Sequence, residues 1–129
     1  MTDLKETNTP ETDRDGRFWY NELNRFHRLD GPAIELSSGH KYWYVNGERH
    51  RLDGPACEYA SGAKVWWVND KRHRLDGPAA EESDGTALWW YVNGVELSGP
   101  FELLEHGANW RDLVEWLTPR EIALCRSRK

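Results

Sequence analysis

The seven residues HRLDGPA occur three times in this chain, beginning at His27, His50 and His73, so that successive copies lie 23 residues apart. A fixed period in the twenties is typical of repeat proteins, in which each unit is one supersecondary structure that stacks on the next. The two clearest units cover residues 39–61 and 62–84. This periodicity limits the fold more than any other feature, because every unit must present the same contacts to its neighbours.

The copies at both ends of the repeat region are atypical. The first begins at Phe18 and has one extra residue before its HRLDGPA, and the last is a half copy over residues 85–100 in which this element is reduced to LSGP. Such end units are expected because each lacks one neighbour. We therefore divide the chain into a polar, disordered tail over residues 1–16, a β-repeat domain over 17–100 and a helical cap over 101–129.

Each unit has the composition of short antiparallel strands. The runs KYWYV, KVWWV and LWWYV are aromatic and β-branched, which favours strand over helix. Asn-Gly or Asn-Asp follows each run, and Asn-Gly is the strongest short signal for a hairpin. A polar return strand then leads to Asp-Gly-Pro, a typical turn sequence. The fold class predicted is therefore mainly β, an antiparallel meander of 23-residue repeats with a short α-helical cap.

Alternation of side chains along a strand predicts two aromatic faces. One face carries a tryptophan and a valine from each unit, namely Trp43, Trp66 and Trp90 with Val45, Val68 and Val92. The opposite face carries Tyr44, Trp67 and Tyr91. A single curved sheet buries only one face, so the other needs a cover: the C-terminal helices, a second layer or a partner.

The period changes to that of helices near the C-terminus. In NWRDLVEWL, Trp110, Leu113, Val114 and Leu117 fall on one helical stripe, and Asn109 precedes them as an N-cap. The sequence TPRE, residues 118–121, is a capping box that predicts a second helix to about residue 126. These helices are expected to close the open edge of the last repeat.

The combination of an aromatic strand, an NG turn, a basic return strand and a glycine turn at this period resembles the MORN repeat. The likeness covers residues 18–97, and the form WYVNGERHRLDGPA is closer to the bacterial and viral variants, which include antitoxin-like proteins. The resemblance implies a scaffold or protein-binding module. The familiar MORN unit reads YEGxWKxGxxxGxG, whereas this chain has HRLDGPA in place of the glycine-rich end, so the partners of MORN proteins are not carried over.

The repeated histidines and aspartates favour structural roles over chemistry. Equivalent residues of consecutive units lie two strands, or about 10 Å, apart, which is too far for shared coordination of one metal ion. We expect each histidine to hydrogen-bond a turn, and each aspartate of DGPA to accept from backbone donors two residues on. The sequence offers no phosphate-binding loop, nucleophile motif or paired metal-ligand spacing. We therefore predict no enzymatic activity, no metal and no cofactor.

The arginines predict charge pairing across strands. Alternation places Arg49 and Arg72 on the same face as the arginines of HRLDGPA, which are Arg28, Arg51 and Arg74. A matching series of Glu35, Glu58 and Glu81 lies on the neighbouring segment. Opposite charges on adjacent strands pair weakly, so surface pairing is favoured over phosphate binding.

The aromatic strip is the main functional signal, because Tyr, Trp and Arg are the types enriched at binding hot spots. The predicted partner-binding residues are Tyr42, Tyr44, Trp67, Trp89, Tyr91, Arg49, Arg51, Arg72 and Arg74. Burial of the same strip under the C-terminal helices is the open alternative. We predict a non-catalytic protein-binding module, and the family resemblance suggests a phage- or bacterium-encoded inhibitor of a host defence complex or toxin.

Two other functions stay open. In one, bases stack on Trp67 or Trp89 and phosphates bind Arg51 or Arg74. In the other, the repeats form a structural scaffold that oligomerises. The net charge of −5 and the acidic pI argue against general binding to nucleic acid or to anionic membranes. The polar N-terminus and the two cysteines favour a cytoplasmic, reducing location, although a Cys57–Cys125 disulfide stays open.

Overall fold

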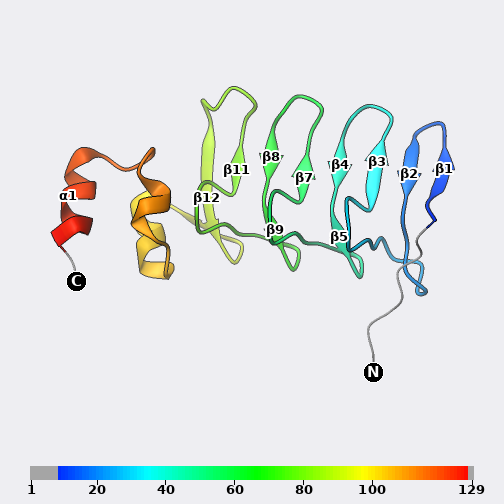
Figure 1. Cartoon of the computed structure of the whole chain (residues 1–129), viewed down its shortest axis with the longest axis horizontal. Helices are drawn as coiled ribbons and strands as arrows, with labels where there is room; N and C mark the ends of the chain where they lie inside the picture. Colours follow the sequence, from blue (N-terminus) through cyan, green and yellow to red (C-terminus); the bar gives the residue numbers. More distant parts are fainter. Residues whose placement is uncertain (1–8, 128–129) are drawn as a thin grey trace.

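The computed structural model describes residues 9–127 and shows one long antiparallel sheet. Its hairpins lie side by side in sequence order, with the C-terminal helices at one end of the row (Figure 1). In sheet order the nine strands are β1 (Glu11–Asp13), β2 (Gly16–Phe18), β3 (Ile34–Leu36), β4 (Lys41–Tyr42), β7 (Cys57–Glu58), β8 (Lys64–Val65), β11 (Ala80–Glu81), β12 (Leu88–Val92) and β13 (Val95–Leu97). The predicted mainly β meander with a short C-terminal helix is confirmed.

Two of the repeats each add a separate two-stranded hairpin beside the main sheet. These are β5 (Tyr44–Val45) with β6 (Glu48–Arg49), and β9 (Trp67–Val68) with β10 (Lys71–Arg72). Their turns need positive φ at both central residues, and Asn46 and Gly47 have φ of 51° and 82°. The predicted hairpin turns are therefore confirmed.

The aromatic run of a middle repeat is broken in two at its central tryptophan. The N–H of Trp43 donates to the carbonyl of Ala56 at 2.7 Å, while the carbonyl of Trp43 accepts from His50 at 3.2 Å. Pairing thus passes from the main sheet to the small hairpin at this residue, and the chain bends there. In the last repeat β12 runs unbroken through the equivalent tryptophan, Trp90.

The N-terminal prediction was wrong for the residues nearest the sheet. Residues 11–16 were expected to be disordered, but β1 pairs with β2 in the register Glu11↔Phe18. The side chain of Asp13 accepts hydrogen bonds from the backbone N–H of Asp15 and of Gly16 and closes the turn. A polar segment can form this strand because an edge strand pairs through its backbone. Residues 1–8 lie outside the described residues.

The buried positions common to the repeats are occupied by small residues, the first repeat also buries Trp19 and Ile34, and the larger core lies at the C-terminal end. Ala33, Ala56 and Ala79 occupy equivalent positions and are completely buried. The C-terminal core packs β12 and β13 against three helices, which are η1 (Pro100–His106), η2 (Trp110–Leu113) and α1 (Pro119–Ser127). The repeats themselves therefore form a thin layer whose tryptophans need other cover.

The caps of the C-terminal helices follow the prediction. The side chain of Asn109 accepts from the N–H of Arg111, and Thr118 and Glu121 exchange the two hydrogen bonds of a capping box. One expectation was wrong, because η2 is a short 3₁₀ helix and Val114 after it is 46% exposed. The tighter 3₁₀ winding moves Val114 away from the buried stripe.

Candidate protein-binding surface

The arginine of each HRLDGPA lies over the tryptophan of its own repeat. The guanidinium carbon of Arg28 is 3.8 Å from the centre of the Trp19 ring. The equivalent pairs, Arg51 with Trp43 and Arg74 with Trp66, are 4.0 Å and 3.8 Å apart. A cation over an indole face contributes about 0.5–1 kcal/mol at exposed sites and more when desolvated. We call these stacked pairs the clamps and the side of the sheet that carries them the clamp face.

Hydrogen bonds fix the orientation of each guanidinium in its clamp. In the middle repeat, Arg51 Nε donates to Asp53 Oδ1 at 3.0 Å, and Nη1 donates to the carbonyl of Pro55 at 3.0 Å and to Glu58 Oε2 at 3.1 Å. The first and third clamps repeat the bonds to the aspartate and the proline carbonyl, and their contacts to glutamate are longer, 3.5 Å from Arg28 to Glu35 and an ion pair of 3.8 Å from Arg74 to Glu81. HRLDGPA recurs because its Arg, Asp and Pro carbonyl build one clamp per unit.

The glycine of HRLDGPA leaves room for the guanidinium. A Cβ atom on Gly54 would lie 2.8 Å from Cζ of Arg51, and one on Gly77 would lie 2.6 Å from Cζ of Arg74. Both distances are shorter than a van der Waals contact. Glycine therefore permits the close approach of the arginine, and a larger residue at this position would force the guanidinium to shift.

The predicted pairing of arginine with glutamate is confirmed, since Arg28, Arg51 and Arg74 all reach a glutamate of the neighbouring strand. Two details of the prediction were wrong. Asp53 and Asp76 accept from the arginine Nε two residues earlier instead of capping the backbone two residues on. Arg49 and Arg51 also separate, Arg49 over Trp67 and Arg51 over Trp43, because the chain bends after β6 and strand alternation ends there.

The repeated histidines join each repeat to the next, as expected for side chains that bond turns. Nδ1 of His27, His50 and His73 accepts from the backbone N–H of Asn46, Asn69 and Asn93, at 3.0, 3.0 and 3.1 Å. An accepting Nδ1 carries no proton, so these bonds need the neutral ring. Within residues 9–127, no cluster of three His, Cys, Asp or Glu side chains is arranged for a metal ion.

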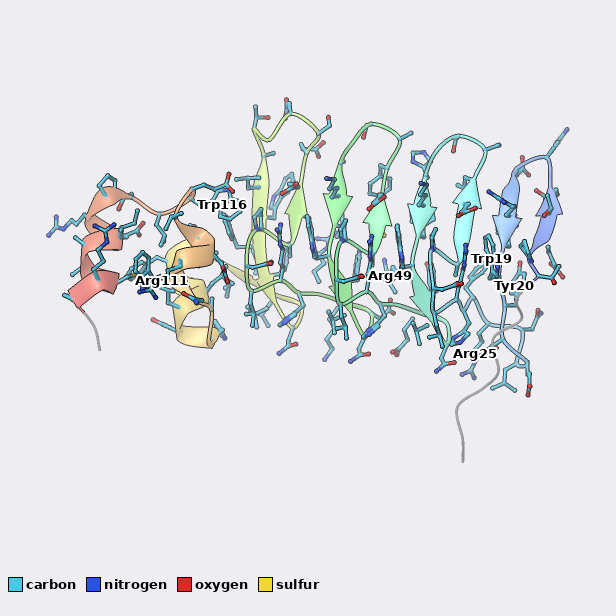
Figure 2. All side chains as sticks on the ribbon, in the orientation of Figure 1. Trp19, Tyr20, Arg25, Arg49, Arg111 and Trp116 are labelled. Carbon is cyan, nitrogen blue, oxygen red and sulfur yellow. The ribbon has the colours of Figure 1, made fainter. Side chains whose placement is uncertain are left out.

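The opposite face, here called the tyrosine face, carries most of the predicted aromatic strip. Three of its aromatics pack against a side chain of the preceding repeat: Tyr44 against Phe26 in a tilted arrangement at 5.4 Å, Trp67 against Arg49 at 3.7 Å, and Tyr91 against Arg72 at 5.3 Å. Arg49 lies in the middle of the row of hairpins (Figure 2) and also pairs with Asp70 at 2.8 Å. These aromatics are half-buried and brace neighbouring repeats.

The pKa shifts of ionisable groups on this face fit a structural role in contacts between repeats. Hydrogen bonds from Arg49 lower the pKa of Asp70, and burial raises the pKa of Tyr44. Burial also raises the pKa of the Cys57 thiol, which is opposite to what a nucleophilic thiolate requires. Cys57 and Cys125 are both free thiols, so the disulfide that the sequence left open is not formed.

One part of the tyrosine face is open. Trp89 is 38% exposed and borders a groove of about 270 Å³ that Tyr59, Arg72 and Tyr91 also line. Tyr42 lies apart from this groove and packs edge-on against Tyr59, with ring centres 5.9 Å apart. The structure thus brings three of the nine predicted residues, Arg72, Trp89 and Tyr91, to one open groove.

Two larger grooves lie between consecutive repeats on the clamp face. The first groove has a volume of about 730 Å³ and is lined by Arg28, Leu29, Trp43, Val45, Arg51 and Leu52, among others. The second groove, of about 670 Å³, is lined by the residues 23 positions later: Arg51, Leu52, Trp66, Val68, Arg74 and Leu75. Two of the predicted residues, Arg51 and Arg74, therefore line grooves on the face opposite the expected strip.

Two exposed leucines mark these grooves and were missed in the sequence. Leu29 is 67% exposed and Leu52 is 80% exposed, although both are large apolar side chains. The signal that points to them is the leucine of each HRLDGPA, an apolar residue repeated directly before a polar turn. A periodic exposed leucine indicates a contact surface more strongly than an isolated one.

Comparison with protein-family models, curated proteins and solved structures gives no match. The likeness to MORN repeats therefore stays a prediction from the residues quoted above. No helix within residues 9–127 is long and apolar enough to cross a membrane.

Proposed function

We propose that this chain is a non-catalytic protein-binding module and that the two open grooves of the clamp face are its main contact surface. The observation that carries the proposal is the exposure of Leu29 and Leu52 at equivalent positions in these grooves. Each groove combines an apolar side chain, a tryptophan and an arginine, and the latter two types are enriched at binding hot spots.

A capture experiment tests this proposal. The wild-type protein and a Leu29→Glu/Leu52→Glu variant are immobilised, and proteins bound from a lysate of the source cells are compared. Both leucines are largely exposed, so the variant should keep its circular dichroism spectrum. Leu23→Glu is the matched control, because Leu23 is 56% exposed and lies outside both grooves. A partner captured equally by all three proteins would refute the role of the grooves.

The predicted aromatic strip offers a second contact surface at one end. Trp89 is the exposed member, and the groove beside it is smaller than either groove of the clamp face. Tyr44, Trp67 and Arg49 make ring contacts between repeats, so their substitution should affect stability before binding. Trp89→Ala, which removes the most exposed ring, tests this surface separately.

The other predicted functions receive less support from the geometry. Nucleotide binding needs a free ring face and an unpaired cation. Trp89 offers an exposed ring, but Arg49 covers Trp67, and Arg51 and Arg74 are each paired with two carboxylates. An oligomerising scaffold would show a mass that rises with protein concentration. The suggestion that the partner is a host defence complex or a toxin rests on the family resemblance and stays a prediction.

A further inference from the structure

The third HRLDGPA and strand β12 of the fourth repeat form a partial equivalent of these grooves, here called the third groove, and it is closed. Its residues are much less exposed than their equivalents in the open grooves. Trp90 and Val92 are 7% and 8% exposed, whereas the equivalent Trp66 and Val68 are half-buried. Pro78 is fully buried where Pro55 is half-buried. The first two copies of HRLDGPA therefore border open grooves, whereas the third borders a filled position to which the fourth repeat, without an HRLDGPA of its own, contributes Trp90 and Val92.

The leucine of HRLDGPA shows the same change. Leu52 is 80% exposed, but Leu75 is half-buried and packs against the C-terminal core. Since the two leucines occupy equivalent positions, the difference comes from what lies over the third groove. The repeat itself leaves this leucine in solvent.

The chain's own C-terminal segment fills the third groove. Leu103, Leu113 and Leu117 are buried in one cluster with Trp90 and Val92. The Trp116 ring packs edge-on against Trp90, with ring centres 5.6 Å apart, and Figure 2 shows it between the C-terminal helices and the end of the sheet. Short helical turns that present leucine and tryptophan are thus one occupant that this groove shape accepts.

We propose, as a refinement that rests on the function proposed above, that the two open grooves bind a short helical segment of a partner protein that presents leucine and tryptophan side chains. Such a segment would cover Leu29 or Leu52 as the C-terminal helices cover Leu75. The helices η1 and η2 have seven and four residues, too few to persist alone, so they depend on packing. A partner segment would likewise fold as it docks.

A titration of the full-length protein with a peptide of its own residues 98–127 tests the kind of occupant. Within the chain, covalent attachment gives this segment a high effective concentration beside the sheet. As a separate peptide it should therefore bind weakly, with a Kd up to about 1 mM. We expect saturable changes in the NMR signals of Leu29 and Leu52. Leu52→Glu should weaken binding about tenfold, because Leu52 lines both open grooves, and Leu23→Glu should leave it unchanged.

A second peptide and one further measurement complete the test. A peptide with serine in place of Leu113 and Leu117 should not bind. Equal binding of the first peptide to wild type and to Leu52→Glu, or no binding at all, would overturn the proposed kind of occupant. Association of the protein with itself without peptide would point to a second copy as the occupant and would also overturn it.

The two proposals fail in different ways. If the peptide fails but the Leu29→Glu/Leu52→Glu variant still loses its captured partner, the grooves bind protein of another shape. If the captured partner is also retained by that variant, the grooves are not the contact surface, and both proposals about them are wrong.

Discussion

The effect of Gly54→Ala on the free energy of unfolding should change sign with Arg51: the substitution should destabilise the protein when Arg51 is present and stabilise it when Arg51 is absent. The Cβ of alanine would lie 2.8 Å from Cζ, 3.0 Å from Nε and 3.1 Å from Nη1 of Arg51. The guanidinium must therefore move by several tenths of an ångström. It is held by Trp43 at 4.0 Å and by hydrogen bonds to Asp53 and to the Pro55 carbonyl, so movement weakens these contacts.

The expected cost follows from the contacts of this clamp. Stacking contributes about 0.5–1 kcal/mol, and a hydrogen bond to a charged group contributes about 1.5–3 kcal/mol. Asp53 is 86% exposed, so its ion pair adds little beyond these two contributions. A partial displacement should therefore lower the free energy of unfolding by about 1 kcal/mol, which corresponds to a fall in Tm of about 3–5 °C.

Removal of the arginine should reverse the effect. In an Arg51→Ala background there is no guanidinium for the new methyl group to displace, and the φ of Gly54 is not in the left-handed region. Alanine then stabilises the fold by about 0.4–1 kcal/mol, because it restricts the unfolded chain. Urea unfolding of the four proteins in this double-mutant cycle measures both effects. If Gly54→Ala changed stability in the same direction with and without Arg51, the close approach of the guanidinium would not be the reason for glycine at position 54.

Three further predictions concern the links between repeats and the C-terminal cap. Burial lowers the pKa of His73, whose Nδ1 accepts from Asn93, so the unfolded chain takes up the proton more readily. The contribution of His73 to stability is therefore complete above the unfolded pKa of about 6.5 and is lost as the pH falls from there through the folded pKa. Urea unfolding between neutral and mildly acidic pH should show this loss, and His73→Gln should reduce it. Trp116→Ala should lower the free energy of unfolding by about 2 kcal/mol through the lost packing on Trp90, measured by urea unfolding. Thr118→Ala removes half of a capping box and should cost about 1 kcal/mol, detected as faster amide exchange in the last helix.

Local signals predicted the parts of the fold that depend on neighbouring residues. The hairpin turn at Asn46 and Gly47 and the capping box at Thr118 follow from the conformations and side-chain bonds that those residues favour. The pairing of Arg51 with Glu58 followed from the repeat spacing. Such features involve residues within one unit, so the sequence was sufficient.

The parts that were missed depend on bends and on positions distant in the chain. Strand alternation placed Arg49 and Arg51 on one face, but the chain leaves the strand after β6, and the two side chains separate. The stacking of Arg51 on Trp43 depends on that bend. The grooves form only where two repeats meet, so no single unit contains one. The exposure of Leu52 follows from this assembly.

The way in which each repeat covers its tryptophan explains why the clamp face carries grooves at all. A sheet packed against a second layer buries one face under apolar side chains, whereas each clamp here covers a tryptophan with a single guanidinium. One arginine covers one ring and leaves the space between consecutive HRLDG turns open. The fourth repeat lacks HRLDGPA and so supplies no arginine for Trp90. The C-terminal helices cover this ring with apolar side chains instead, and the adjacent groove is then closed. Open grooves and the need for a helical cap therefore have the same physical cause.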